Sequence, residues 1–184
     1  MKAFDILTNE HGLIRHFLDN MGMAAQKIEE GQTPPAAFFE NGVEFARRFA
    51  DKYHHHKEEY VMFTRLAQTA GGEIDDQIQS LRHQHERSRE CISTIAESLS
   101  GYEAGDSIKT GNLLEAVSAY VSLLRHHIHT EDHVFYPMAK EALSEEDQAA
   151  LVEEFNKDSA KFGAETFQEC HKLVVDMGSM LVHL

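Results

Sequence analysis

Two short motifs constrain this chain more than any other feature. A histidine is followed four residues later by a glutamate at His54/Glu58 and again at His127/Glu131. Residues four apart lie on one face of a helix, so each pair presents an imidazole and a carboxylate to the same neighbour. Both pairs stand in the apolar stripe of a helical pattern, where a lone carboxylate is costly to bury. The chain must therefore fold so that these buried groups find partners.

Apolar residues recur at spacings of three and four along four long stretches of the chain, as in amphipathic helices. The predicted helices cover about residues 3–30, 36–70, 73–99 and 112–143. Gly31, Gly71-Gly72 and the glycine-containing segment 100–111 are predicted to separate them, and Pro137 to kink or loosen the fourth. Long amphipathic helices with short connections predict an all-α fold, an antiparallel up-down four-helix bundle.

The residues after 143 predict one additional C-terminal helix. Ser144 and Asp147 resemble a capping box, which marks a helix start. This helix should pack outside the four, because the far face of the second helix is also apolar and needs a cover. A second subunit could supply that cover instead, so a homodimer stays open. We expect one domain, with the bundle at 1–143 and a helical extension at 144–184.

The two halves of the chain look like copies of one helical hairpin. The two His-Glu pairs are 73 residues apart, and the lone histidines His11 and His85 are 74 apart. In this second register Arg89 matches Arg15. Each copy therefore supplies one lone histidine and one His-Glu pair, and two antiparallel hairpins would bring them to one level inside the bundle.

This arrangement predicts a metal centre. Its expected ligands are His11, His54, Glu58, His85, His127 and Glu131. Mixed imidazole and carboxylate ligation suits iron, manganese or zinc, and six side chains are too many for one tetrahedral zinc. Two metals bridged by the two glutamates and by an oxo or hydroxo group would leave about two positions for water or a diatomic ligand. His55, His83 and His126 flank the predicted ligands and are alternate or supporting candidates.

The charge and cysteine content narrow the partners and the compartment. A net charge of −14 argues against nucleic acid and against an anionic membrane surface. The sequence has no apolar run of membrane-spanning length and no evident secretory signal. Cys91 and Cys170 lie far apart, so neither a disulfide framework nor a thiolate zinc site is expected. We expect a cytoplasmic protein.

Four segments of the chain together resemble the hemerythrin-like, or HHE cation-binding, family over about residues 4–143. They are NEHGLI, HHHKEEYVMF, RHQHERSR and HHIHTEDHVFYPMA. The resemblance implies an up-down four-helix bundle with a non-haem di-iron site that binds or senses oxygen, nitric oxide or peroxide. Oxygen-carrying hemerythrins place two histidines on the third helix as HxxxH, whereas Leu81 and Arg89 flank His85 here. One nitrogen ligand is therefore expected to be missing, which favours reaction over reversible carriage.

Three functions fit these expectations. The first is a di-iron protein that binds or senses a diatomic ligand, oxygen or nitric oxide. The second is a di-iron oxidoreductase acting on peroxide, nitric oxide or ferrous iron, with an electron donor that the sequence does not identify. The third is a structural helical module whose histidines hold zinc or no metal. No separate general acid or base stands out from the sequence.

Overall fold

The computed structural model describes residues 2–69, 72 and 74–182, and every regular element in this part of the chain is helical. The all-α class is therefore confirmed. The elements are α1 (Ala3–Glu29), α2 (Ala36–Phe45), η1 (Ala46–His55), η2 (Lys57–Met62), α3 (Phe63–Thr69), α4 (Asp75–Glu103), α5 (Ser107–Thr130), η3 (Glu131–Phe135), α6 (Tyr136–Ala142), α7 (Glu145–Phe162) and α8 (Thr166–Leu181), where η marks a π-helix. Within the described residues, no helix combines the length and apolarity needed to cross a membrane.

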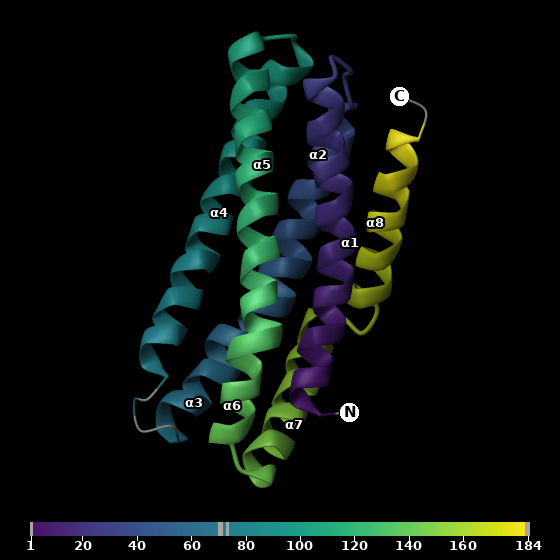
Figure 1. Cartoon of the computed structure of the whole chain (residues 1–184). Helices are drawn as coiled ribbons and strands as arrows, with labels where there is room; N and C mark the ends of the chain where they lie inside the picture. Colours follow the sequence, from purple (N-terminus) through teal and green to yellow (C-terminus); the bar gives the residue numbers. More distant parts are fainter. Residues whose placement is uncertain (1, 70–71, 73, 183–184) are drawn as a thin grey trace.

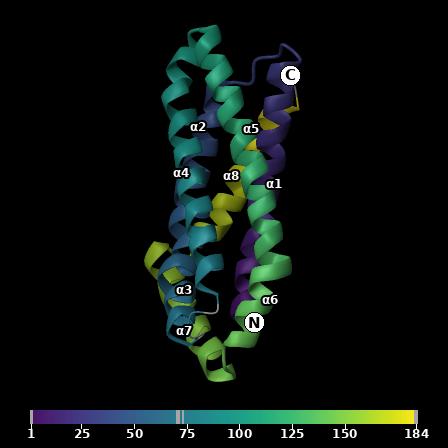
Figure 2. The same cartoon turned by 60° about the vertical axis from the view of Figure 1, so that its left-hand side comes forward.

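The elements up to α6 form four long rods that lie side by side and run alternately up and down the molecule (Figures 1 and 2). Rod 1 is α1; rod 2 is α2 continued through η1, η2 and α3; rod 3 is α4; rod 4 is α5 continued through η3 and α6. Rod 4 contacts rods 1 and 3, and rod 2 also contacts both, so the four rods surround a shared interior.

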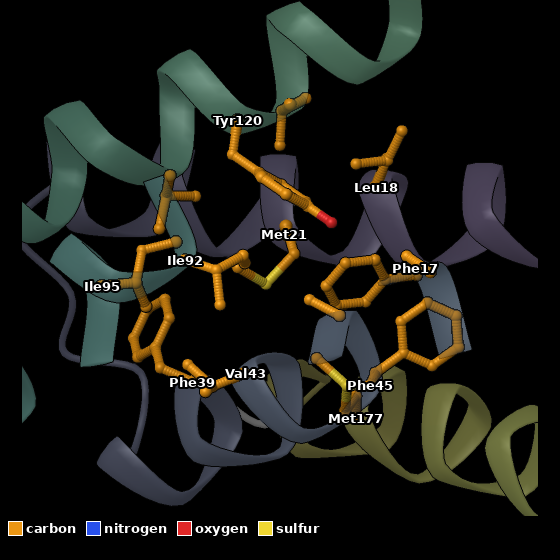
Figure 3. Packing of buried hydrophobic residues seen from close by; sticks show 14 of the residues in the cluster. Phe17, Leu18, Met21, Phe39, Val43, Phe45, Ile92, Ile95, Tyr120 and Met177 are labelled. Atoms are coloured by element: carbon orange, nitrogen blue, oxygen red, sulfur yellow. The ribbon is translucent and has the colours of Figure 1, made fainter. Parts of the chain in front are cut away.

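Two apolar clusters fill this interior, and a layer of buried polar side chains lies between them. Figure 3 shows part of the larger cluster, in which Phe17, Ile92 and Tyr120 approach from three different rods. The smaller cluster, at the end near the N-terminus, includes Leu7 and Phe63. Burial of these side chains is the main force that holds the rods together. It also places the polar layer out of reach of water.

π-helical turns interrupt rods 2 and 4 at the two His-Glu pairs. The amide of Phe63 donates to the carbonyl of Glu58, and the amide of Tyr136 donates to the carbonyl of Glu131, each five residues back along the chain. Such i→i+5 bonding widens the turn and is frequent at functional sites. Because the two turns are 73 residues apart, they follow the internal repeat of the sequence.

The boundary between rods 3 and 4 differs from the sequence prediction. The predicted loop at 100–111 is wrong, because only residues 104–106 separate α4 from α5. A Cβ at Gly101 would lie 2.3 Å from Cγ of Lys109, so this glycine allows a close approach of the two helix ends rather than a loop. The side chain of Asp106 accepts hydrogen bonds from the first amides of α5 and starts it early.

The remaining helix boundaries agree with prediction or lie outside the described residues. The first helix, predicted at 3–30, is confirmed by α1. The predicted end of the second helix at Ala70 and start of the third at Glu73 both fall outside the described residues. Pro137, predicted to kink or loosen the fourth helix, stands in the first turn of α6, directly after a π-helical segment with wider turns.

The single C-terminal helix expected from the sequence is in fact two helices, α7 and α8. Ser144 starts α7 with the predicted capping box to Asp147, and the chain then turns at Gly163, whose φ of 106° disfavours any other residue. Both helices pack on the outside of rods 1 and 2. They cover the apolar far face of rod 2: Phe167 of α8 contacts Phe49 at 5.6 Å between ring centroids.

Candidate metal centre

All six predicted ligands are brought together in the polar layer. Each has no more than 1% of its surface exposed, and together they come from all four rods. They are His11 on α1, His54 and Glu58 on rod 2, His85 on α4, and His127 and Glu131 on rod 4. The apolar stripes of the four rods put them here, because each residue interrupts such a stripe and turns inward with it.

The imidazoles form two pairs, and the carboxylates lie between the pairs. Nε2 of His11 is 3.0 Å from Nε2 of His54, and Nε2 of His85 is 3.1 Å from Nε2 of His127. Glu131 Oε2 lies 3.2 Å from His11 Nε2 and 3.1 Å from His127 Nε2. Glu58 Oε2 lies 3.4 Å from the nitrogen of His85 and 3.7 Å from that of His54. Each carboxylate therefore reaches one imidazole of each pair, as a bridging ligand must.

A fifth imidazole, that of His55, joins the group. It is buried and stacks on the ring of His85 at 3.8 Å between centroids. Donor atoms within 4.8 Å of one another fall into two groups: His55, Glu58, His85 and His127; and His11, His54, Glu58 and Glu131. The third helix contributes only one histidine to the centre, as expected. The centre still has five imidazoles, because His55 of rod 2 supplies the one that was expected to be missing. The other two candidates, His83 and His126, are exposed and belong to neither group.

Two adjacent histidines, His54 and His55, lie at the end of the π-helical segment η1, and both are buried. In a regular α-helix neighbouring side chains diverge by about 100°. The wider turn of η1, with bonds five residues apart, rotates less per residue. His55, predicted as an alternate or supporting candidate, thus lies beside the six predicted ligands.

The donor atoms of the centre are unsatisfied in a way that fits a bound cation. Among the described residues, four buried atoms lack a hydrogen-bond partner at this site: His55 Nδ1, Glu58 Oε2 and both carboxylate oxygens of Glu131. Buried carboxylate oxygens without partners are costly, and two carboxylates side by side also repel each other. Cations between them would satisfy both demands, so the residues present fit a metal centre.

The pKa values of the ligands shift in both directions. Burial would lower the pKa of His11, but Asp132 and Glu131 outweigh it and raise that pKa. Burial, followed by the neighbouring charge of Glu131, raises the pKa of Glu58 well above its usual range. Burial would also raise the pKa of Glu131, but His127 and His11 outweigh it and lower that pKa well below its usual range. Burial lowers the pKa of His54, and that of His85 likewise, which favours the neutral imidazole that binds metals.

Four of the imidazoles are held from behind through Nδ1. The contacts are His11 to Asp132 at 2.9 Å, His54 to Glu10 at 2.9 Å, His85 to Glu59 at 2.6 Å and His127 to Gln84 Oε1 at 3.0 Å. Such partners fix the tautomer and leave Nε2 free for a metal. Arg15 and Arg89 in turn form ion pairs with Asp132 and Glu59 respectively.

Sequence reasoning missed these supporting residues and one more, Tyr136. Its hydroxyl donates to Glu58 Oε1 at 2.6 Å and lies 3.4 Å from His11 Nε2. One signal could have found two of the supports: in both halves an acidic residue directly follows the glutamate of the pair, as Glu59 and Asp132. Tyr136 carries no such signal, because its inward position depends on the π-helical turn before it.

A buried cluster of five histidines and two glutamates, with unsatisfied donors and ordered supports, defines a metal-binding helical protein. The family model of the hemerythrin HHE cation-binding domain matches residues 2–139. The chain therefore belongs to the hemerythrin HHE cation-binding family.

Relatives of this chain occur among mycobacterial proteins. An uncharacterized protein of Mycobacterium bovis is 26% identical over 176 residues, which cover 95% of this chain and 68% of the relative. Uncharacterized proteins from two strains of Mycobacterium tuberculosis match with the same identity and coverage. No solved structure shows a significant match.

Proposed function

We propose that this protein is a four-helix bundle that holds two iron ions and binds a diatomic ligand, oxygen or nitric oxide, at them. The observation that carries the proposal is the pair of buried carboxylates between two sets of imidazoles, in which three of the four carboxylate oxygens lack hydrogen-bond partners. One ion would be held by His11 and His54, the other by His55, His85 and His127. Both would share Glu58 and Glu131. Bound iron supplies a Lewis-acidic and redox-active centre for a diatomic ligand.

The ligand count leaves room for a small molecule. Two six-coordinate ions offer about twelve positions, of which five imidazoles and two bridging carboxylates fill about nine. The surroundings favour an uncharged ligand, because apolar clusters close the layer on both sides. Phe63 and Phe135, which touch edge to face at 5.5 Å, form part of the wall next to the site. The chain's own residues thus bind the ions, orient the imidazoles and exclude water.

The proposal is tested by loading the protein with ferrous iron under anaerobic conditions and measuring iron per chain together with the visible spectrum. We expect about two irons per chain and a spectrum that changes when nitric oxide or oxygen is added. The double substitution His54→Ala and Glu58→Ala should lower the iron content, whereas His129→Ala, at an exposed histidine of the same chain, should leave it unchanged. One zinc or no metal per chain would contradict the proposal and favour a structural module.

A second candidate, a di-iron oxidoreductase acting on peroxide, nitric oxide or ferrous iron, is favoured by Tyr136. Its hydroxyl oxygen lies 2.6 Å from Glu58 Oε1 and donates a hydrogen bond to it inside the buried site. A phenol in this place can donate its proton to a reacting molecule. The substitution Tyr136→Phe separates the two functions: it should abolish turnover of peroxide or nitric oxide in an enzyme, and should leave ligand binding in place in a binding protein.

A further inference from the structure

The internal repeat makes the two sides of the centre nearly equivalent. Each side has a chain of three residues, here called an arm, in which an acidic residue contacts a histidine and an arginine contacts the acidic residue. On one side His11 is held by Asp132, which is held by Arg15; on the other, His85 is held by Glu59, which is held by Arg89. Residues of rods 1 and 3 correspond at 74 residues and those of rods 2 and 4 at 73. Under these offsets the two arms are the same three positions, with Glu59 matching Asp132.

The groups behind His54 and His127 are not equivalent. His54 is held by Glu10, whose second oxygen accepts a hydrogen bond from Nζ of Lys57 at 2.8 Å. The corresponding residues behind His127 are Gln84 and Thr130. Gln84 is a neutral amide that accepts at 3.0 Å, and the hydroxyl of Thr130 donates instead to the carbonyl of His126. The imidazole of His54 thus contacts a buried ion pair, whereas its counterpart His127 contacts an uncharged side chain.

The ion pair is deeply buried and tightly held. Lys57 has 0% and Glu10 has 2% of its surface exposed. The ammonium group also donates to the carbonyl of Tyr53 at 2.9 Å and lies 3.3 Å from the centroid of the Tyr53 ring. Burying two opposite charges in this way costs desolvation free energy that their attraction often fails to return. Stability is therefore a weak reason for the pair, and its contact with His54 offers a better one.

The pair stands on the side of the centre that has fewer imidazoles. His11 and His54 are the two imidazoles of one donor group, whereas the other group has three, those of His55, His85 and His127. A carboxylate behind an imidazole makes it a stronger donor than an amide does. Lys57 holds the second oxygen of Glu10 and balances its charge, so this carboxylate stays behind His54. The ion pair therefore compensates for the missing third imidazole.

We propose that Glu10 and Lys57 are positioning residues that strengthen His54 as a ligand, and so raise the metal affinity of the position held by two imidazoles. This inference rests on the proposed two-metal function. It assigns the ion pair to one of the two ions only. The other ion is held without it, through Gln84.

The test is the double variant Glu10→Gln and Lys57→Thr, which gives the first half the residues of the second. Both residues change together, because either single change would leave one buried charge without a partner. Stepwise titration of the metal-free protein with ferrous iron should show one ion bound as in the unaltered chain and the other about 10–100-fold more weakly. In the ⁵⁷Fe Mössbauer spectrum one iron component should shift while the other keeps its position. Circular dichroism of the metal-free variant checks that it folds.

The matched control is Lys172→Thr with Asp176→Asn, which removes an exposed ion pair in α8. It should change neither affinity nor the spectrum. Unchanged affinities in the test variant, or equal weakening of both ions, would overturn the role of Glu10 and Lys57 while leaving two irons per chain. Fewer than two irons in the unaltered protein would overturn the proposed function, and this inference with it.

Discussion

Two buried carboxylates dominate the chemistry of this molecule at the scale of single residues. Glu58 and Glu131 are fully buried and adjacent, and together three of their oxygens lack hydrogen-bond partners. Such groups destabilise a protein that lacks cations. Their negative charges repel each other, and no attraction to a cation offsets the free energy of their desolvation. The features that suit the site to metal therefore lower the stability of the metal-free fold.

The substitution Glu58→Gln should separate these two effects. The new amide keeps an acceptor for the Tyr136 hydroxyl, and it is neutral without the proton that the raised pKa of buried Glu58 demands. We expect the free energy of unfolding of the metal-free protein to rise by about 1–3 kcal/mol, and its iron content to fall. Denaturant unfolding in the presence of a chelator measures the first, and elemental analysis the second. A less stable metal-free variant would show that the carboxylate is satisfied without metal.

Residues of the site could be predicted where they stand at helical spacing from the apolar residues of a stripe. Residues without that spacing could not be chosen from the pattern. His11 and His85 stand at helical spacing from Leu7 and Leu81, so the stripe itself points them inward. The sequence offers His55 only as an alternate ligand, because it directly follows His54 and does not continue the 3-4 spacing of that stripe. Glu10 and Lys57 face each other between rods 1 and 2, and only the packing of those rods shows that they are buried.

At the scale of helices, one backbone position decides the shape of the outer layer. Helical patterning continues through residues 145–181, and nothing in the apolar spacing predicts a break. The break occurs because Gly163 adopts a positive φ and its amide ends α7 on the carbonyl of Ala160. The turn lets α7 lie near the lower end of the molecule in Figure 1 and α8 continue upward beside α1.

The substitution Gly163→Ala should therefore destabilise the protein. A side chain is strained at this φ, and its Cβ would lie 3.3 Å from Oγ1 of Thr166. We expect the free energy of unfolding to fall by about 1–2 kcal/mol. The control is Gly12→Ala, at an exposed site within α1 that has open space around it. There alanine should raise the free energy of unfolding by about 0.5–1 kcal/mol. In thermal unfolding, Gly163→Ala should therefore lower the melting temperature and Gly12→Ala should raise it.

At the scale of the whole molecule, metal and fold should be coupled. The five imidazoles and two carboxylates come from all four rods, so a bound ion ties every rod to the others. A cation that binds only the folded chain stabilises it by about 2.7 kcal/mol at one hundred times its dissociation constant. We expect the melting temperature to rise with ferrous iron and to return with a chelator. A melting temperature insensitive to iron would indicate that the fold does not depend on the centre.

The outer helices should be needed for the same fold. Phe38, Phe45 and Phe49 are fully buried, and α7 and α8 pack on the rods that carry them. Figure 3 shows Met177 of α8 beside Phe45. A chain ending at residue 143 would expose an apolar face, so we expect it to aggregate or to associate through that face. Size-exclusion chromatography tests this; a monomeric, folded 1–143 fragment would instead make residues 144–184 a separate appendage.

The seam between the two halves of the repeat runs through the metal centre, and this has a consequence for protein engineering. Neither half carries a complete ligand set: His11 and His54 need Glu131 from the other half, and His85 and His127 need Glu58. If the two halves were made as separate polypeptides, each would be an incomplete chelator. Their reassembly would then depend on the supply of the bound metal, so the pair could serve as a split reporter of the availability of that metal.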